Sequence, residues 1–189
     1  DPIVLSAEAG LLSIQDANLP YIEINTMEDL HKAYTWVTTD PAANEFKSIA
    51  IDSISEVAEV VLAYELSRNK DGRAAYGELN RVMADIIRSF RNIPDKHVYM
   101  SAKLEKSQDE MGRMLYSPSM PGKTLSQQLP YFFDEVLALR VEKDADGSTQ
   151  RALMTDSDGL WSAKDRSGKL DAWEAPNLGD VIEKIGGAK

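Results

Sequence analysis

Asp52 and Ser53 follow a short apolar run, Ile49-Ala50-Ile51, and precede an amphipathic pattern that extends from Ile54 to about Arg68. A short run of this kind before a helix is typical of a buried strand in a parallel sheet. Asp52 would then lie at the carboxyl end of its strand, where open α/β sheets bind ligands, and its carboxylate could hold Mg²⁺ beside a nucleotide's phosphates. Ser53 could touch the same site. The alternative is that both residues only cap the next helix, because Asp and Ser are favoured capping types.

Two further residues follow predicted strands in the same way. Glu8 comes after the apolar run Ile3-Val4-Leu5-Ser6, and its carboxylate could orient an attacking water as a general base. Lys103 leaves the strand predicted over 97–101, and its ammonium could touch a phosphate. The alternatives are an exposed turn residue for Glu8 and a solvated side chain for Lys103.

Lys164 and Arg166 lie one residue apart on a chain that we expect to be extended, so their side chains face the same side. They could clasp a phosphate, or they could belong to an exposed turn.

Pro121-Gly122-Lys123-Thr124 resembles the tail of a phosphate-binding loop, but the complete motif needs a glycine where this chain has Ser117. The loop also needs a buried strand before it, and the preceding residues are polar. We therefore exclude this segment as a phosphate cradle and interpret Thr124 as the cap of a helix over 125–132.

Composition limits the classes of function. The 189 residues suffice for one domain with a sizeable core, and 43% hydrophobic and 28% charged residues are ordinary for a soluble globular protein. The absence of cysteine excludes disulfides and thiolate metal sites, and two histidines argue against a histidine-rich one. The net charge of −10 argues against a uniformly basic nucleic-acid surface. No apolar run is long enough for a membrane span, and no signal peptide is visible.

The order of elements predicts an α/β fold. Strands over 3–6, 21–24, 48–52 and 97–101 alternate with helices over 26–38, 54–68 and 74–92, which suits a parallel sheet with right-handed crossovers. The segment 102–120 is irregular, with a hairpin tip at Met111-Gly112. The C-terminal part predicts an antiparallel meander: strands over 134–141, 151–155 and 160–163, with a turn at Asp144-Ala145-Asp146-Gly147. Asn177 caps a last helix, 178–185.

These pieces together resemble phage-encoded RecA-like nucleotide-binding proteins, a group of P-loop ATPases related to single-strand annealing and recombination. The resemblance covers nearly the whole chain. It rests on Glu8-Ala9-Gly10-Leu11-Leu12-Ser13, Ile51-Asp52-Ser53, Asp71-Gly72-Arg73-Ala74-Ala75-Tyr76-Gly77-Glu78-Leu79, Pro121-Gly122-Lys123, Asp134-Glu135-Val136 and Ala163-Lys164-Asp165-Arg166-Ser167-Gly168.

The resemblance implies a fold and a set of roles. It implies a single RecA-like P-loop NTPase core over 1–189, with ATP as substrate and Mg²⁺ as cofactor. Asp52 would be the Walker B carboxylate, with Ser53 beside the nucleotide, and Glu8 the catalytic glutamate. Lys103 would be near the sensor position, and Lys164 and Arg166 would reach into a neighbouring subunit's ATP site.

The resemblance also implies partners. A residue that acts on a neighbour's site implies a homo-oligomer, as a ring or a filament. Single-stranded DNA would contact the irregular segment through Lys106 and Arg113. The expected location is the cytoplasm of a bacterial host, without membrane attachment.

One part of the family pattern does not occur in these residues: the Walker A loop with its glycines, lysine and Ser/Thr, which the family carries before the strand that begins here at Ile3. Because the chain begins Asp1-Pro2, we expect that this segment lies upstream, and that the 189 residues alone hydrolyse ATP weakly or not at all. The alternative is a non-catalytic RecA-fold module that acts through binding or assembly.

Overall fold

The computed structural model describes residues 1–8, 10–143 and 146–186. The chain divides into two compact units, which are described separately. Unit 1 comprises Asp1–Lys103 and Ser119–Leu125, and unit 2 comprises Leu104–Pro118 and Ser126–Lys189. Within the described residues, no helix is both long and apolar enough to cross a membrane.

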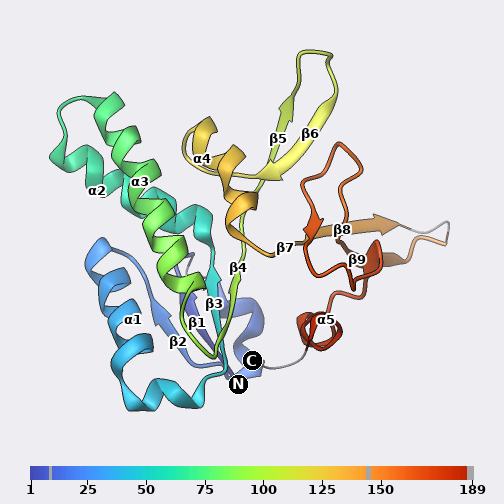
Figure 1. The fold of residues 1–189 in the computed structure, drawn as a ribbon, viewed down its shortest axis with the longest axis horizontal. Helices are drawn as coiled ribbons and strands as arrows, with labels where there is room; N and C mark the ends of the chain where they lie inside the picture. The colour runs from blue at the N-terminus through green and yellow to red at the C-terminus, as the bar shows by residue number, and fades with distance from the viewer. Residues whose placement is uncertain (9, 144–145, 187–189) are drawn as a thin grey trace. The chain divides into compact units, whose positions relative to one another are not determined.

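Unit 1 is built on a parallel four-stranded sheet in the order β2-β1-β3-β4 (Figure 1). Its strands are β1 (Pro2–Ser6), β2 (Tyr21–Glu23), β3 (Ser48–Asp52) and β4 (His97–Met100). Its helices are η1 (Leu11–Ala17), α1 (Met27–Thr39), η2 (Pro41–Glu45), α2 (Ile54–Arg68) and α3 (Gly72–Arg91). The predicted α/β class with a mainly parallel sheet and flanking helices is confirmed.

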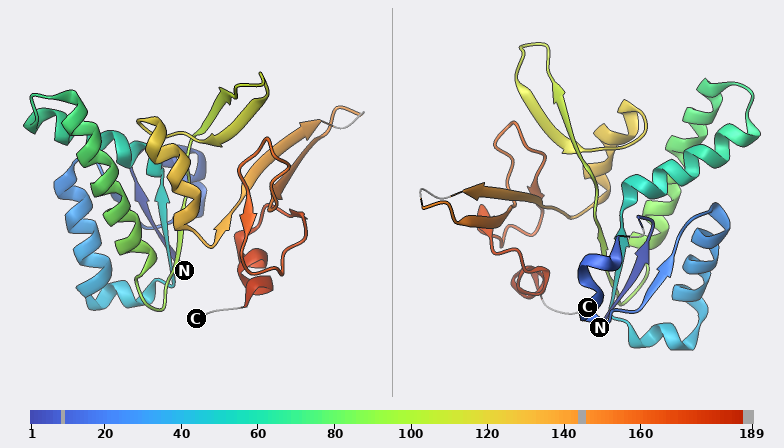
Figure 2. Two further views of the ribbon diagram at one scale, coloured as in Figure 1. Left: turned by 45° about the horizontal axis from the view of Figure 1, so that its top comes forward. Right: turned by 180° about the vertical axis from the view of Figure 1, so that it is seen from behind.

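The direction of the crossovers places the helices on the two faces of this sheet. The chain steps one way from β1 to β2 and the other way from β2 to β3 and from β3 to β4. Right-handed crossovers then place η1 on one face and α1 and α3 on the other, as Figure 2 shows. η1 is a 3₁₀ helix of about two turns, from Leu11 to Ala17.

The core of unit 1 lies between the sheet and its long helices. Leu5, Ile49 and Ile51 of the strands are fully buried. Four large apolar residues at helical spacing are buried on α3: Leu79, Met83, Ile87 and Phe90. The Phe90 ring meets Tyr34 of α1 edge-on at 5.1 Å between centroids.

Capping residues fix where the helices begin. Thr26 accepts a hydrogen bond from the Asp29 N–H at 3.1 Å and donates to the Asp29 carboxylate at 2.8 Å, which is the capping pattern at the start of α1. Asp71 caps α3 through the Arg73 N–H, so this helix begins at Gly72 and not at the predicted Ala74. The helix α4 (Lys123–Gln128) begins before Thr124, and the prediction of Thr124 as its cap is wrong. The predicted single helix over 125–132 is two elements, α4 and the 3₁₀ helix η3 (Leu129–Phe132).

Unit 2 contains small antiparallel sheets. The hairpin predicted around Met111 is confirmed as β5 (Leu104–Gln108) and β6 (Met114–Pro118). The other strands are β7 (Glu135–Val136), β8 (Ala138–Lys143), β9 (Thr149–Met154), β10 (Lys164–Asp165) and β11 (Trp173–Glu174), followed by α5 (Leu178–Ile185) with Asn177 as its cap.

The predicted C-terminal meander is antiparallel, but its third strand is different. The sheet order is β11-β9-β8, and Trp173 and Glu174 take the place predicted for residues 160–163. That predicted segment forms only a single bridge, between Tyr116 and Trp161. The rings of these two residues stack at 4.3 Å. Of the predicted turn between β8 and β9, Asp144 and Ala145 lie outside the described residues.

Candidate functional site

The ends of β1, β3 and β4 meet at the carboxyl edge of the four-stranded sheet. Ser6 lies opposite Asp52 in the register of β1 and β3. Beyond the strands, the Ala7 N–H donates to the Asp52 carbonyl at 2.7 Å, and the Ser101 N–H donates to the Ile51 carbonyl at 3.0 Å. These backbone bonds continue the sheet by a residue, so side chains that are far apart in the sequence lie together at this edge.

The Asp52 carboxylate is oriented by a residue that the sequence reasoning missed. The Ser101 hydroxyl donates to Asp52 Oδ1 at 2.5 Å. Ser101 is the first residue after β4. In the sequence it is also the first polar residue after the run Val98-Tyr99-Met100, and this position could have indicated a residue at the sheet edge. Asp52 is half-buried, and the peptide bond that joins it to Ser53 is cis.

Ser53 connects the end of β3 to Glu8. Its hydroxyl donates to Glu8 Oε1 at 2.5 Å and accepts the Glu56 N–H at 3.4 Å. Ser53 therefore caps α2 and also contacts the candidate general base, so the capping interpretation of this residue is confirmed and its place beside the nucleotide stays a prediction. Ser53 itself is only 3% exposed.

Lys103 carries the positive charge at this edge. Its ammonium forms an ion pair with Glu56 and lies 3.7 Å from Glu8 Oε1. The hydrogen bond to Glu56, helped by the charges of Glu56 and Glu8, raises the pKa of Lys103 above the usual lysine value. The ammonium is thus both exposed to solvent and paired with carboxylates, so the solvated side chain that the sequence left open also has fixed partners. We call Glu8, Asp52, Ser53, Ser101 and Lys103 the carboxyl-edge cluster.

A small pocket of about 120 Å³ adjoins Lys103. It is lined by Ser55, Glu56, Glu59, Lys103, Ser119, Met120 and Pro121. All of these residues belong to unit 1.

Gly122, next along the chain from that pocket, has a φ of +83°. A Cβ at this position would lie 3.3 Å from the ring of Tyr76, so the turn approaches that ring closely. The segment comes after a strand of an antiparallel hairpin, β6, and not after a buried parallel strand. This agrees with its exclusion as a phosphate cradle.

Magnesium suits the donors at the carboxyl-edge cluster. Among the described residues, no group of three or more His, Cys, Asp or Glu side chains could hold a metal by itself. Mg²⁺ does not require such a group, because it is usually held by one or two carboxylates together with waters and substrate phosphates. Ser101 occupies one oxygen of Asp52, and the other oxygen is the one that would bind the ion.

Lys164 and Arg166 lie on and just after β10, in unit 2. The Lys164 ammonium donates to the carbonyls of Pro130 and Phe133, at 2.8 and 2.5 Å. Burial, and next the charge of Arg166, lowers the pKa of Lys164. Arg166 is exposed and donates to the Asp134 carboxylate at 2.9 Å. The two cations thus differ in their surroundings: Lys164 binds backbone carbonyls, whereas Arg166 makes a surface ion pair.

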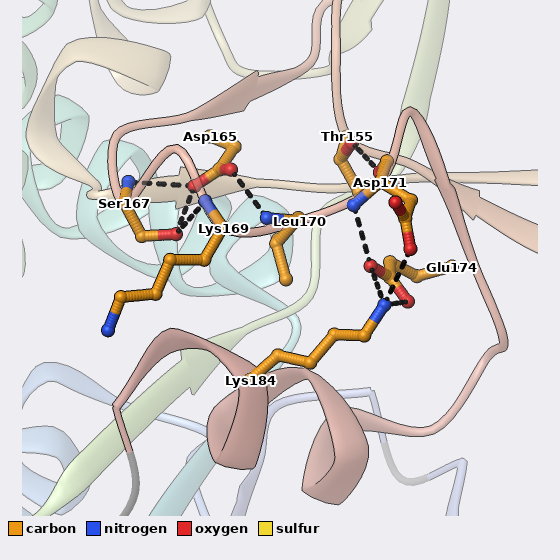
Figure 3. Close-up of polar contacts among 8 residues, drawn as sticks. All are labelled: Thr155, Asp165, Ser167, Lys169, Leu170, Asp171, Glu174 and Lys184. Carbon is orange, nitrogen blue, oxygen red and sulfur yellow. Dashed lines mark hydrogen bonds and ion pairs between the residues drawn. The ribbon is translucent and has the colours of Figure 1, made fainter.

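The turn that carries Arg166 is organised by Asp165 (Figure 3). Its carboxylate accepts hydrogen bonds from the N–H and hydroxyl of Ser167 and from the N–H groups of Gly168 and Leu170, at 2.6 to 3.2 Å. Burial alone would raise the pKa of Asp165, but these bonds, first those of Ser167, hold it well below its usual range. Its neighbour across the strand pair, Glu135, has a pKa raised to about 7 by burial and by Asp165.

Lys106 and Arg113, the residues expected to contact DNA, lie on and next to the β5–β6 hairpin of unit 2. The exposed Lys106 ammonium lies 5.8 Å from the centroid of the Tyr116 ring. Arg113 Nε donates to the Asp109 carboxylate at 2.7 Å, and the Asp109 carboxylate also accepts the backbone N–H of Arg113. Arg113 therefore helps to close the hairpin turn.

Comparison with known proteins identifies the family to which this chain belongs. A family profile described as an AAA domain matches residues 1–167, and the comparison with curated proteins finds no match. Among solved structures, the chain is similar to a KaiC-like protein from the hyperthermophilic archaeon Pyrococcus horikoshii OT3, with 13% identity and a TM-score of 0.40 over 81% of this chain. The chain spans 62% of the length of that structure. Because the family profile covers most of its residues, the chain belongs to the AAA domain family, within the P-loop NTPase superfamily.

Proposed function

We propose that this protein binds a Mg²⁺–ATP complex at the carboxyl edge of its four-stranded sheet and hydrolyses it. The observation that carries the proposal is that Glu8 and Asp52 follow or end neighbouring strands at one sheet edge. Glu8 accepts a hydrogen bond from Ser53, the residue next to Asp52, and the Asp52 carboxylate accepts one from Ser101. Family membership supports the nucleotide, because AAA domains belong to the P-loop NTPases.

Three residues of the cluster have a chemical role in the proposal. Asp52 would hold the ion, and the ion would supply positive charge to the phosphates of the nucleotide, from which a nucleoside diphosphate leaves. Glu8 accepts the proton of the water that adds to the terminal phosphorus. Lys103 supplies a positive charge within 3.7 Å of Glu8. The phosphate loop of the superfamily is not among these 189 residues, so the proposal assigns only the carboxylate side of the site.

The test separates binding from turnover by substituting the two carboxylates in the full-length gene product. Asp52→Asn should weaken Mg²⁺-dependent ATP binding, measured by calorimetry with and without Mg²⁺. Glu8→Gln should keep that binding and lower turnover by about a hundredfold, since general-base catalysis contributes 10²–10⁴-fold. Glu142→Gln, an exposed carboxylate on β8, is the control and should change neither. Equal binding by wild type and Asp52→Asn would refute the metal role.

We further propose that Arg166 acts on the ATP site of a neighbouring copy, so that the active form is a homo-oligomer. Its exposure supports this role, while Lys164 holds the local backbone through Pro130 and Phe133. Arg166→Ala should abolish turnover and keep ATP affinity. Mixing it with Asp52→Asn should restore part of the activity, because mixed assemblies pair an intact Asp52 with an intact Arg166. No recovery at any mixing ratio would exclude sharing between subunits.

Single-stranded DNA is the partner that we propose for the β5–β6 hairpin, in line with a role in phage recombination or replication. A cation over an aromatic ring, as in Lys106 and Tyr116, is a pairing that single-strand binders use. Three carboxylates, Glu105, Asp109 and Glu110, oppose the two cations of the hairpin, so binding should be weak and should depend only mildly on salt. Lys106→Gln should reduce the anisotropy change of a labelled oligonucleotide, and Lys143→Gln should not. Unchanged binding in Lys106→Gln would rule out the hairpin as the contact.

A second function, binding or assembly without hydrolysis, is favoured by one observation. The Glu8 carboxylate is already engaged by Ser53 and lies next to the Lys103 ammonium, which would hold it away from a water. This function predicts ATP binding that depends on Asp52 without any turnover that depends on Glu8. The same pair of variants therefore distinguishes the two functions.

A further inference from the structure

Ser55 stands in the first turn of α2 and is only 4% exposed. Its hydroxyl accepts the backbone N–H of Lys103 at 2.9 Å and donates to the backbone carbonyl of Ser119 at 2.7 Å. Both partners are distant in sequence, by 48 and 64 residues. A serine inside a helix commonly bonds a carbonyl of its own helix, as Ser67 of α2 does with Tyr64. Ser55 instead joins two segments from elsewhere in the chain.

These two segments are the points where the chain leaves unit 1 for the β5–β6 hairpin and where it returns. The Ser119 N–H donates to the Lys103 carbonyl at 2.7 Å, so the outgoing and returning segments are bonded to each other as well as to Ser55. Two hydrogen bonds thus hold the backbone of Lys103, one on each side of its Cα, and the third joins Ser55 to Ser119.

The side chain of the same lysine reaches the carboxyl-edge cluster. Its ammonium is paired with Glu56, the residue next to Ser55, and lies 3.7 Å from Glu8. A long, exposed lysine loses rotamer entropy when it is held in one place, so its ammonium stays beside the carboxylates only if its backbone is well positioned. Ser55 is the side chain that provides this position.

We propose that Ser55 is a positioning residue, which clasps the base of the β5–β6 hairpin and so places the Lys103 ammonium beside Glu8. Ser55 touches neither Glu8 nor Asp52 in the described contacts, and it acts through Lys103. Through the same two hydrogen bonds, Ser55 joins Ser119 to Lys103, the residue whose ammonium lies beside Glu8. The effect on turnover rests on the proposed function, but the placement of Lys103 does not.

The experiment reads the position of the Lys103 ammonium directly, in the full-length protein without nucleotide. The pKa of Lys103 is measured by NMR after isotopic labelling of lysine side chains, and Lys103→Met identifies its signal. In Ser55→Ala, this pKa should fall towards the ordinary lysine value because the ammonium loses its fixed place beside Glu56 and Glu8. Ser55→Thr, which keeps the hydroxyl, should retain the raised pKa. Ser67→Ala, on the same helix, should leave it unchanged.

Two further measurements complete the test. The Lys103 amide should be protected from hydrogen exchange in the wild type, which tests the clasp even if Ser55→Ala does not fold. In the ATPase assay, Ser55→Ala should lower kcat by about tenfold while KM stays nearly constant, since small misplacements of catalytic groups act on the chemical step. A Lys103 pKa that is the same in Ser55→Ala and wild type, or an unprotected Lys103 amide, would overturn the proposal. Loss of the pKa shift in a protein without ATPase activity would support the clasp and refute only the proposed hydrolysis.

Discussion

Ser53 uses one hydroxyl for two purposes. It accepts the Glu56 N–H as the cap of α2 and donates to Glu8. Asp71 caps α3 through the Arg73 N–H at 2.9 Å, but it lies outside the carboxyl-edge cluster. Ser53 and Asp71 are therefore a matched pair. Replacing each of them shows how much a helix cap contributes to stability, and only the replacement of Ser53 also alters the carboxyl-edge cluster.

Replacing either cap should cost a similar free energy of unfolding. Ser53→Ala and Asp71→Ala should each destabilise the protein by about 1 kcal/mol, the usual loss for a helix cap. Urea unfolding followed by circular dichroism measures this loss. Only Ser53→Ala should also change ATP turnover, because only Ser53 bonds Glu8. If both variants change turnover equally, the Ser53–Glu8 hydrogen bond does not contribute to catalysis.

At the scale of elements, local patterns in the sequence were enough for the long helices and the parallel sheet. The apolar spacing of α3 and the capping types before α1 and α2 determine these helices nearly by themselves. Two-residue strands have no such pattern. Trp173 and Glu174 form a strand only because β9 lies beside them, so β11 could not be predicted from local sequence.

The turn before α4 should depend on its glycine. Gly122→Ala should lower the free energy of unfolding by about 1 kcal/mol or more, because φ is +83° and the new methyl would press on Tyr76. Gly77→Ala on α3 is the control, since nothing lies within 4 Å of a Cβ there. It should stabilise the helix by about 0.5–1 kcal/mol. Urea unfolding should therefore show changes in the free energy of unfolding of opposite sign for the two variants. A stabilising effect of Gly122→Ala would contradict the strained turn at this position.

The β7–β10 pair should make stability depend on pH. Burial, and next the contact with Asp165, raises the pKa of Glu135 from 4.5 to about 7. Between these values the folded protein binds a proton that the unfolded chain has lost, so stability should fall as the pH rises from 5 to 8. Asp165 contributes no slope in this range, because its pKa is lowered and its contribution is lost only in acid.

Glu135→Gln tests this dependence. It should reduce the slope of the melting temperature against pH, whereas Glu142→Gln, an exposed carboxylate, should leave the slope as it is in the wild type. If the slope of the melting temperature against pH is the same in Glu135→Gln as in the wild type, a group other than Glu135 causes the pH dependence of stability.

At the scale of the whole molecule, the sequence indicated which residues lie at the sheet edge of unit 1, but it did not indicate their hydrogen-bond partners. The carboxyl ends of parallel strands share an edge, so Glu8, Asp52 and Lys103 could be grouped before any coordinates. Their partners depend on side-chain placement between distant segments, as with Ser101 on Asp52 and Ser55 on Lys103, and no local pattern indicates such pairs. In unit 2, the carbonyl partners of Lys164 were equally hidden, because they come from the turn around Pro130 and Phe133.

The central claim is that a metal–nucleotide complex binds at the carboxyl edge of the parallel sheet. Mn²⁺ suits the same oxygen ligands as Mg²⁺, and it broadens NMR signals near it. With ATP and Mn²⁺ added to the full-length protein, we expect the amide signals of Glu8, Ser53 and Ser101 to broaden first, and Asp52→Asn to remove this effect. Broadening centred elsewhere, or broadening at these residues that persists in Asp52→Asn, would contradict the account.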